Sequence, residues 1–186
     1  MSSFPLNPLQ ASSSTPGGLV DHAAYAPLMH ALAEEGILCV LTDMPLRLAV
    51  MDMNAADGVA EKYPQVTRWS IGGHSLGGAM AASYAAAHPG DFAALALLAA
   101  YSTEPLPDDL AVVSLCGTAD RVLDWEKYEA SRVNLPATAQ EIAIPGGNHA
   151  QFGSYGAQKG DGVATISAQA QLNATVNALL PLLTGE

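Results

Sequence analysis

The sequence predicts an α/β protein in which helices cover both faces of a mostly parallel sheet. Short aliphatic segments alternate with longer alanine-rich segments along the 186 residues, which is typical of repeated β-α units. Several short segments are apolar without alternation, as expected for strands that are buried on both faces. Glycine or proline follows several of the longer segments, where a helix would end. The expected architecture is a three-layer α/β sandwich with about six mostly parallel strands.

The individual elements follow from these patterns. After a weak segment at 9–14, the strand candidates are residues 37–42, 67–72, 94–99, 111–116 and 139–144. The helix candidates between and after them are residues 22–35, 54–63, 76–88, 124–131 and 166–183. Gly36, Pro64 and Pro89 end the first three helices, because these residues do not continue a helix. No internal repeat and no linker rich in proline, glycine and serine divides the chain, so one domain spanning 1–186 is expected.

Charge and composition exclude several classes of partner. The formal net charge is −11 with only seven lysines and arginines, so the surface repels nucleic-acid phosphates and anionic lipid. No apolar run reaches the length of about 18 residues that crosses a membrane. The first residues, MSSFPLNPLQASSS, lack the basic and apolar regions of a secretory signal, so a cytoplasmic location is expected. Cys39 and Cys116 lie in apolar strand-like runs and are expected to be free, buried thiols.

Ser75 is the candidate nucleophile. It lies at the centre of the motif G-x-S-x-G, here Gly73-His74-Ser75-Leu76-Gly77. The motif follows a strand candidate and opens a helix candidate, which is the context that a nucleophile elbow requires. At such a bend the serine adopts a strained backbone conformation, and the residues two positions away must lack side-chain bulk. The start of the following helix would also stabilise negative charge that develops beside the serine.

A serine hydroxyl needs a base, and five histidines are available. His22 and His30 have the spacing of a helix surface, and His88 precedes a proline at a helix end. His74 is adjacent to the serine, and adjacent residues on an elbow point in different directions. His149 follows the last strand candidate and therefore emerges at the carboxyl edge of the sheet, where the serine also emerges. We expect His149 to be the base.

The base needs an acid that fixes its tautomer. Asp120 follows the penultimate strand candidate at the same edge of the sheet, and it lies between the serine and the histidine in chain order. Asp124 is the reserve candidate. Asp91, Asp108 and Asp109 lie in loops that open on the opposite edge. We expect Asp120 to be the acid.

These residues and the segments around them resemble the α/β-hydrolase superfamily, and more narrowly its small bacterial members of the carboxymethylenebutenolidase-like group. The resemblance runs from about Pro16 to the final helix, through PGGLVDHAAYAPLMHALAEEG, GGHSLGGAMAASYA, GTADRV and GGNHAQFGSYG. It implies an α/β-hydrolase fold with Ser75 as nucleophile, Asp120 as acid and His149 as base. It also implies an oxyanion hole formed by the backbone N–H groups of Leu76 and of Gly17 or Gly18.

The chain departs from the larger members of that superfamily in three places. Residues 1–8 are too short for the antiparallel hairpin that opens the larger members, so about six strands are expected instead of eight. The connection YSTEPLPDDL at 101–110 is too short to hold a lid domain, so the site is expected to be open. The segment LQASSST before Gly17 is small and polar for a strand in the middle of a covered sheet.

The expected reaction is hydrolysis of a small-molecule carboxylic ester through an acyl-enzyme. Four aromatic residues lie beyond strand ends or in the loop of the histidine, where they would either wall an apolar substrate pocket or serve as loop anchors: Tyr101, Trp125, Phe152 and Tyr155. No cofactor and no metal are expected, because metal-ligand spacing and a G-x-G-x-x-G motif after a strand are both absent from the sequence. Acyl transfer, thioester cleavage and a catalytically silent ligand-binding module are the alternatives.

The long glycine-rich segment 145–165 also stands out, since long loops in compact domains are often functional. It would hold His149 in place, close over a substrate, or serve as a plain surface loop. Its charged residues Lys159 and Asp161 are interpreted as solvated loop charges.

Overall fold

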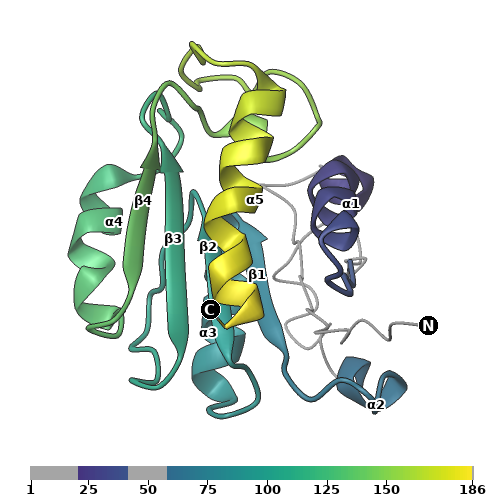
Figure 1. Ribbon diagram of the computed structural model, residues 1–186. Coiled ribbons are helices and arrows are strands. Elements are labelled where there is room, and N and C mark those ends of the chain that lie inside the picture. The colour runs from purple at the N-terminus through teal and green to yellow at the C-terminus, as the bar shows by residue number, and fades with distance from the viewer. Residues whose placement is uncertain (1–20, 42–57, 186) are drawn as a thin grey trace.

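The structure is a computed structural model that describes residues 21–41 and 58–185. At its centre is a four-stranded parallel sheet with the strand order β1-β2-β3-β4. The strands are Ser70–His74 (β1), Ala94–Leu98 (β2), Ala111–Gly117 (β3) and Gln140–Ile144 (β4). All four arrowheads point toward the same edge of the sheet (Figure 1). Residues that directly follow these strands are therefore brought to one edge.

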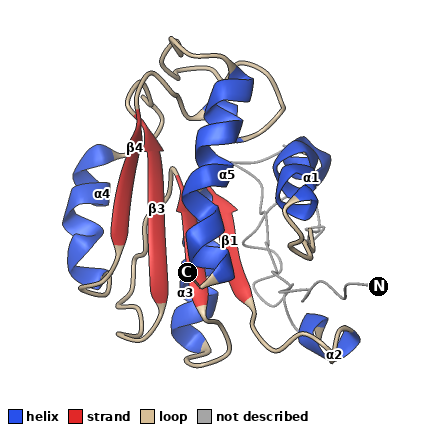
Figure 2. Ribbon diagram, in the orientation of Figure 1, coloured by secondary structure: helices blue, strands red, loops and turns tan. Residues whose placement is uncertain are grey.

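Helices cover both faces of this sheet. Figure 2 shows α5 crossing in front of the strands and α3 behind them. Helix α1 packs beside α5 in one apolar cluster, and α4 packs against β3 through Tyr128 and Cys116. The α-helices are Ala26–Glu34 (α1), Val59–Lys62 (α2), Leu76–Ala87 (α3), Trp125–Ala130 (α4) and Ala168–Thr184 (α5). Within the described residues, short 3-10 helices span His22–Tyr25, Ser131–Asn134 and Ala150–Phe152.

Burial on both faces explains the absence of alternation in the strand sequences. Leu95 and Leu97 of β2 pack in the cluster that includes α3, whereas Ala96 and Leu98 pack in the cluster that includes α1 and α5. Every residue of β1 and β2 is buried. A strand with a helix layer on each side buries all of its side chains, so each position is apolar or small. The predicted three-layer fold is confirmed.

Most predicted elements form where the sequence places them. Strands β2, β3 and β4 and helices α3, α4 and α5 agree with their predicted ranges to within two residues at each end. The predicted helix 22–35 forms as a 3-10 turn followed by α1, and it ends at Gly36, whose φ is +85°. This left-handed conformation is the reason that glycine ends the helix.

Three predicted elements differ from the structure or lie outside it. Strand β1 begins at Ser70 instead of Thr67, because its pairing with β2 starts at Ser70 and Ala94, the first residue of β2. The guanidinium of Arg68, before this strand, donates to the carbonyls of Leu183 at 3.1 Å and Leu182 at 3.3 Å at the end of α5. In the predicted strand 37–42, the described part forms a single bridge residue at Leu38. Segment 9–14, residue 42 and residues 54–57 of the predicted helix 54–63 lie outside the described residues.

The prediction that both cysteines are free is confirmed, and the prediction that they are buried is confirmed for Cys116. Cys39 is partly buried, whereas Cys116, in β3, is buried against Tyr128 of α4. Burial raises the pKa of each thiol to about 11, which keeps both protonated and weakly nucleophilic at neutral pH. No helix within residues 21–41 and 58–185 combines the length and the apolar character needed to cross a membrane.

Candidate active site

Ser75 occupies a strained bend between β1 and α3. Its backbone has φ +55° and ψ −128°, outside the regions that residues with a side chain ordinarily adopt. Such a conformation costs on the order of 1–3 kcal/mol and persists only where the surroundings impose it. The backbone N–H of Ser75 donates to the carbonyl of Leu98 at 2.9 Å, which ties the bend to the end of β2. This is the geometry that the G-x-S-x-G motif predicts.

Two glycines beside Ser75 are required by close approach of the backbone. A Cβ atom at Gly73 would lie 2.6 Å from the backbone carbonyl of Gly77, closer than any real Cβ contact. A Cβ atom at Gly78 would overlap the side chain of Ala100 beyond the end of β2. The first turn of α3 therefore packs directly on β1 and β2, and a residue with a side chain at either position would push helix and sheet apart.

Asp120 and His149 form a buried pair. Asp120 lies in the turn after β3, and His149 lies in the loop after β4. The ring Nδ1 of His149 donates to Oδ2 of Asp120 at 2.8 Å, while Oδ1 of Asp120 accepts the backbone N–H groups of Val122 and Leu123, each at 2.8 Å. Asp120 is 4% exposed and His149 is 1% exposed. An ionised carboxylate only accepts hydrogen bonds, so this contact places the ring proton on Nδ1.

The other ring nitrogen of His149 is free to act as a base. Nε2 is buried and has no hydrogen-bond partner in the described part of the chain, so it is not bonded to Ser75 in this structure. Buried polar atoms are nearly always paired, and an unpaired one calls for an explanation such as a catalytic role. With the proton on Nδ1, Nε2 carries the lone pair that accepts a proton. Catalytic hydrogen bonds are often unformed without substrate and close during the reaction.

The reserve acid, Asp124, has a different role in the structure. It is the N-cap of α4, where its carboxylate accepts the backbone N–H of Lys127 at 3.1 Å and pairs with the Lys127 ammonium at 3.0 Å. The hydrogen bond from the Lys127 backbone lowers the pKa of Asp124. Its side chain is thus engaged at the start of a helix and does not contact His149.

The remaining surface histidines are also placed as the sequence predicts. Nδ1 of His30 lies 3.6 Å from Oε1 of Glu34, one helical turn away. Nδ1 of His22 lies 3.6 Å from Oδ1 of Asp21. His88 stacks on the ring of Tyr84 at the end of α3.

His74 has a role that sequence reasoning missed. It is completely buried, its Nδ1 lies 3.0 Å from the hydroxyl of Tyr25, and its ring centre lies 4.5 Å from that of His149. It therefore forms part of the wall around His149. Tyr25 is 49 positions away in sequence, so no local pattern marks this contact.

His74 makes stability depend on pH. Burial, and next the nearby His149, hold the pKa of His74 well below its ordinary value, so the folded state keeps this ring neutral. The unfolded chain takes up the proton below about pH 6.5, so the free energy of unfolding falls as pH drops through this value, at up to about 1.4 kcal/mol per pH unit. The free energy of unfolding in urea can be measured at pH 7.5 and at pH 5.5. Its decrease between these two pH values should be larger in the wild type than in His74→Asn by about 1 kcal/mol or more. Equal losses in the two proteins would show that His74 does not contribute.

Two of the four predicted pocket aromatics surround His74. The ring of Phe152 lies 5.6 Å from the His74 ring and is 4% exposed. The ring of Tyr155 lies 6.4 Å from His74, and its hydroxyl donates to Gln158 at 3.0 Å. Burial raises the pKa of Tyr155. Both residues therefore pack against His74.

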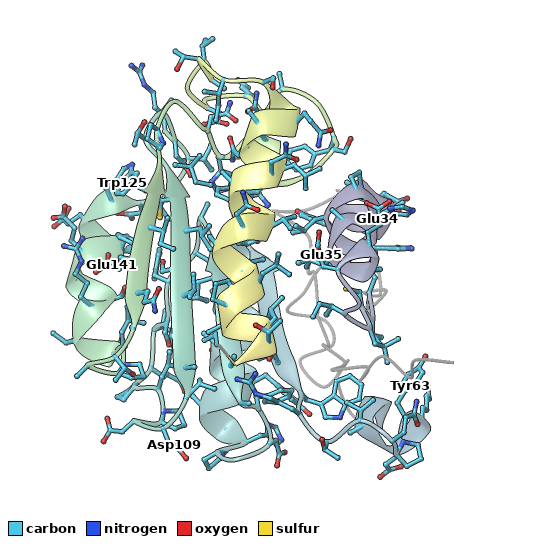
Figure 3. The ribbon with its side chains drawn as sticks, in the orientation of Figure 1. Glu34, Glu35, Tyr63, Asp109, Trp125 and Glu141 are labelled. Carbon is cyan, nitrogen blue, oxygen red and sulfur yellow. The ribbon has the colours of Figure 1, made fainter. Side chains whose placement is uncertain are left out.

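The other two aromatics anchor the region around Asp120. The indole N–H of Trp125 donates to the backbone carbonyl of Asp120 at 3.1 Å, and its ring is 39% exposed at the start of α4 (Figure 3). Tyr101, after β2, packs against the cluster of Cys116, Leu123 and Tyr128. Neither residue lies against His149 in the ring contacts of the described residues.

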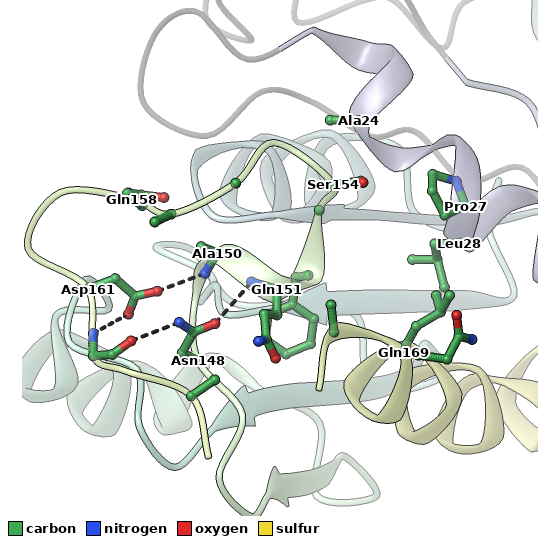
Figure 4. Close-up of a pocket in the computed structure, with 18 of the residues that line it drawn as sticks. Ala24, Pro27, Leu28, Asn148, Ala150, Gln151, Ser154, Gln158, Asp161 and Gln169 are labelled. Atoms are coloured by element: carbon green, nitrogen blue, oxygen red, sulfur yellow. Dashed lines mark hydrogen bonds between the residues drawn. The ribbon is translucent and has the colours of Figure 1, made fainter. Parts of the chain in front are cut away.

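A cavity of about 730 Å³ opens beside the His149 loop (Figure 4). Its walls come from Ala24 and the start of α1, from Asn148 and residues 150–153, from the loop 154–164 and from the start of α5. Of the four predicted aromatics, Phe152 lines this cavity, and Ser75 and His149 do not. Within the described residues, no three His, Cys, Asp or Glu side chains gather as a metal site would require.

The predicted oxyanion hole is described only in part. Leu76 is the first residue of α3, where a backbone N–H has no acceptor within the helix. Gly17 and Gly18 lie outside the described residues.

Comparison with known proteins agrees with this architecture. Residues 14–173 match the family model described as the alpha/beta hydrolase family. The chain belongs to this family. No curated protein matches this alpha/beta hydrolase in sequence.

Solved structures resemble this alpha/beta hydrolase over nearly its whole length. Est1E from Butyrivibrio proteoclasticus has a TM-score of 0.67 at 16% identity, with 95% of this chain and 88% of Est1E covered. A serine hydrolase without lid, XC6422 from Xanthomonas campestris, has a TM-score of 0.66 at 18% identity, with 96% and 84% covered. A monoacylglycerol lipase from Paleococcus ferrophilus has a TM-score of 0.67 at 15% identity, with 96% and 95% covered. At these identities the likeness establishes the fold.

Proposed function

We propose that this alpha/beta hydrolase is a serine esterase that cleaves small-molecule carboxylic esters. The observation that carries the proposal is the buried His149–Asp120 hydrogen bond of 2.8 Å, which leaves Nε2 of His149 unpaired at the edge of the sheet where Ser75 occupies its strained bend. A nucleophile, a base and an orienting acid are the three groups that covalent acyl transfer requires.

The proposed reaction begins with proton transfer from Ser75 Oγ to His149 Nε2. The serine oxygen attacks the ester carbonyl, and the backbone N–H of Leu76, with Gly17 or Gly18 as the second donor, stabilises the oxyanion. The tetrahedral intermediate collapses, and the departing alcohol takes the proton from Nε2. A water molecule then gives a proton to Nε2 and attacks the acyl-enzyme. The second tetrahedral intermediate collapses, the Ser75 oxygen takes the proton back from Nε2, and the carboxylic acid is released. Asp120 stays ionised and stabilises the imidazolium in both halves of the reaction.

The burial of the pair supports this assignment of roles. A charge pair taken out of water interacts strongly, because the surrounding dielectric is low. His149 and Asp120 are both almost fully buried, and two backbone N–H groups hold the second carboxylate oxygen of Asp120. The carboxylate therefore cannot turn away from the imidazole without losing three hydrogen bonds.

The names of the structural neighbours agree with an acyl-transfer reaction. They include a monoacylglycerol lipase and an esterase from Thermogutta terrifontis, esterase 2, which is phosphorylated by paraoxon. Organophosphates modify an activated nucleophile, so the same class of reagent is a suitable probe for this chain.

A fluorophosphonate probe tests the proposed nucleophile directly. The wild type should gain one adduct, and peptide mass spectrometry should place that adduct on Ser75. The Ser154→Ala variant, which changes an exposed serine in the 153–165 loop, is the matched control and should be labelled like the wild type. A wild type that is left unlabelled, or an adduct on another residue, would refute the assignment.

The wild type should also hydrolyse p-nitrophenyl esters, with short acyl chains preferred. The connection between β2 and β3 spans residues 99–110 and forms no helix, so no lid domain covers the site from this side. A site of this kind offers limited apolar surface to a long acyl chain. A panel of acetyl, butyryl, octanoyl and palmitoyl esters measures this preference, and a higher kcat/KM for palmitoyl than for acetyl esters would contradict it.

A further inference from the structure

Asp161 has a position that its sequence context did not predict. The interpretation of Asp161 as a solvated loop charge is not what the structure shows, since this side chain is partly buried and faces inward. Its Oδ2 accepts the backbone N–H of Ala150 at 2.8 Å (Figure 4). Its Oδ1 accepts the backbone N–H of Arg121 at 3.3 Å and that of Gly162 at 2.7 Å. One carboxylate therefore binds two loops that are distant in sequence.

The two loops that Asp161 joins are the loops of the proposed acid and base. Arg121 directly follows Asp120, and Ala150 directly follows His149. The 2.8 Å contact between Nδ1 of His149 and Oδ2 of Asp120 depends on the relative position of these loops. Hydrogen bonds from N–H groups to an ionised carboxylate are about twice as strong as neutral ones. Asp161 thus fixes each loop at the residue next to the pair.

Gly162 allows the same loop to pack closely against the loop of Asp120 and the loop of His149. A Cβ atom at Gly162 would overlap the backbone carbonyl oxygen of Ala119, the residue before Asp120. The carbonyl of Gly162 accepts the side-chain amide of Asn148 at 2.8 Å (Figure 4). Asn148 is the residue before His149, so Asp161 and Gly162 together contact residues on both sides of the acid and of the base.

Helix α5 supports the base from the opposite direction. The side-chain oxygen of Gln171 accepts the backbone N–H of Asn148 at 3.0 Å, and its amide donates to the Asn148 carbonyl at 2.8 Å. Gln171 is completely buried. The peptide groups around His149 are therefore held by α5 on one side and by Asp161 on the other, and Asp161 alone of these two also contacts the loop of Asp120.

We infer that Asp161 is a positioning residue of the site, which keeps the Asp120 and His149 loops in register so that the imidazole stays aligned with its acid. The inference rests on the proposed function. Its carboxylate does not touch a reacting atom, and its effect is transmitted through Arg121 and Ala150. The loop 153–165 thereby holds His149 in place, which is one of the roles that the sequence left open.

The variants Asp161→Asn and Asp161→Glu test this inference. In Asp161→Asn the amide group offers one acceptor oxygen where the carboxylate offers two, so one of the two loops loses its bond. In Asp161→Glu the charge stays while the carboxylate moves by one methylene group. Lys159→Gln changes a neighbouring exposed charge in the same loop and is the matched control. We expect kcat for a short p-nitrophenyl ester to fall about tenfold or more in both Asp161 variants, with KM within about twofold, because misplacing a catalytic group lowers the chemical step.

A second readout is independent of activity. The proton on Nδ1 of His149, which is hydrogen-bonded to Asp120, should give a far-downfield resonance in the proton NMR spectrum of the wild type and of Lys159→Gln. In Asp161→Asn and Asp161→Glu this resonance should move upfield or broaden beyond detection, at a temperature where both variants are folded. A purely structural contribution of Asp161 would lower the melting temperature and leave the resonance and kcat unchanged.

The two readouts separate failure of the inference from failure of the proposed function. If the wild type hydrolyses no ester while the resonance changes in the Asp161 variants, the proposed function is wrong and the positioning of the pair by Asp161 stands. If the resonance and kcat of both variants equal those of the wild type, Asp161 is not a positioning residue.

Discussion

Replacement of Ser75 by alanine is expected to lower kcat/KM for a short p-nitrophenyl ester by about 10⁴- to 10⁶-fold. The variant loses the only side chain of the protein that bonds to the acyl carbon in the proposed mechanism, while the strained bend and the oxyanion donor remain. His149→Ala is expected to have an effect of the same order, because an unactivated serine hydroxyl is a poor nucleophile. Initial rates of p-nitrophenol release measure both variants.

The matched controls for these substitutions are Ser154→Ala and His30→Ala. Ser154 lies exposed in the loop after the 3-10 helix Ala150–Phe152, and the side chain of His30 is 76% exposed on α1. Both controls should keep kcat/KM within about twofold of the wild type, as surface changes usually do. Full activity in Ser75→Ala would mean that the ester is cleaved elsewhere on the chain or by another mechanism.

Replacement of Asp120 by asparagine is expected to lower kcat by about 10³- to 10⁴-fold with little change in the fold. Asparagine keeps an oxygen for the backbone N–H groups of Val122 and Leu123 and turns its amide group toward Nδ1 of His149. Nδ1 of His149 then accepts a hydrogen bond from this amide, and the ring proton lies on Nε2. Nε2 therefore has no lone pair with which to accept the proton of Ser75. The kinetic constants for the ester and the far-ultraviolet circular dichroism spectrum measure the two effects separately.

Asp124→Asn is the control that distinguishes the two aspartates of this segment. Asparagine is about as good an N-cap as aspartate, so α4 should stay formed. The structure places Asp124 at Lys127 and away from His149, so kcat should stay within about twofold of the wild type. A loss in Asp124→Asn as large as the loss in Asp120→Asn would show that the acid is wrongly assigned.

The fold could be predicted because three of the four described strands, β1, β2 and β3, are almost completely buried. A strand such as Ala94–Leu98 admits only apolar or small residues, so its composition alone identifies it. The elbow at Ser75 could be predicted for a related reason, since close approach of α3 and β1 leaves no room for a side chain at Gly73. Where sterics restrict a position to one or two residue types, the sequence reveals the structure.

The contacts between loops could not be predicted in this way. Asp161 and Arg121 are 40 positions apart, and Tyr25 and His74 are 49 positions apart. Each of these hydrogen bonds depends on the path of a loop, and many residue types are compatible with a loop. Asp161 therefore has the same local sequence signature as a solvated charge, and only its position in the fold identifies its partners.

The start of β1 illustrates a third limit. Thr67, Arg68 and Trp69 have the composition of a strand, yet β1 begins only at Ser70. The guanidinium of Arg68 binds the last carbonyls of α5. The carboxyl end of a helix attracts a cation because its final carbonyl groups lack partners within the helix. The start of β1 is set by where its partner β2 begins, since Ser70 pairs with Ala94, and the composition of residues 67–69 does not reveal this.

The central claim is that Nε2 of His149 activates Ser75, and the rate at which a fluorophosphonate probe labels Ser75 tests it most directly. The rate constant for labelling should be at least about 10³-fold lower in His149→Ala than in the wild type and unchanged in His30→Ala, because the attack on phosphorus needs the same proton transfer as the attack on an ester. Equal labelling rates in His149→Ala and the wild type would show that Ser75 reacts without His149 and would contradict this account.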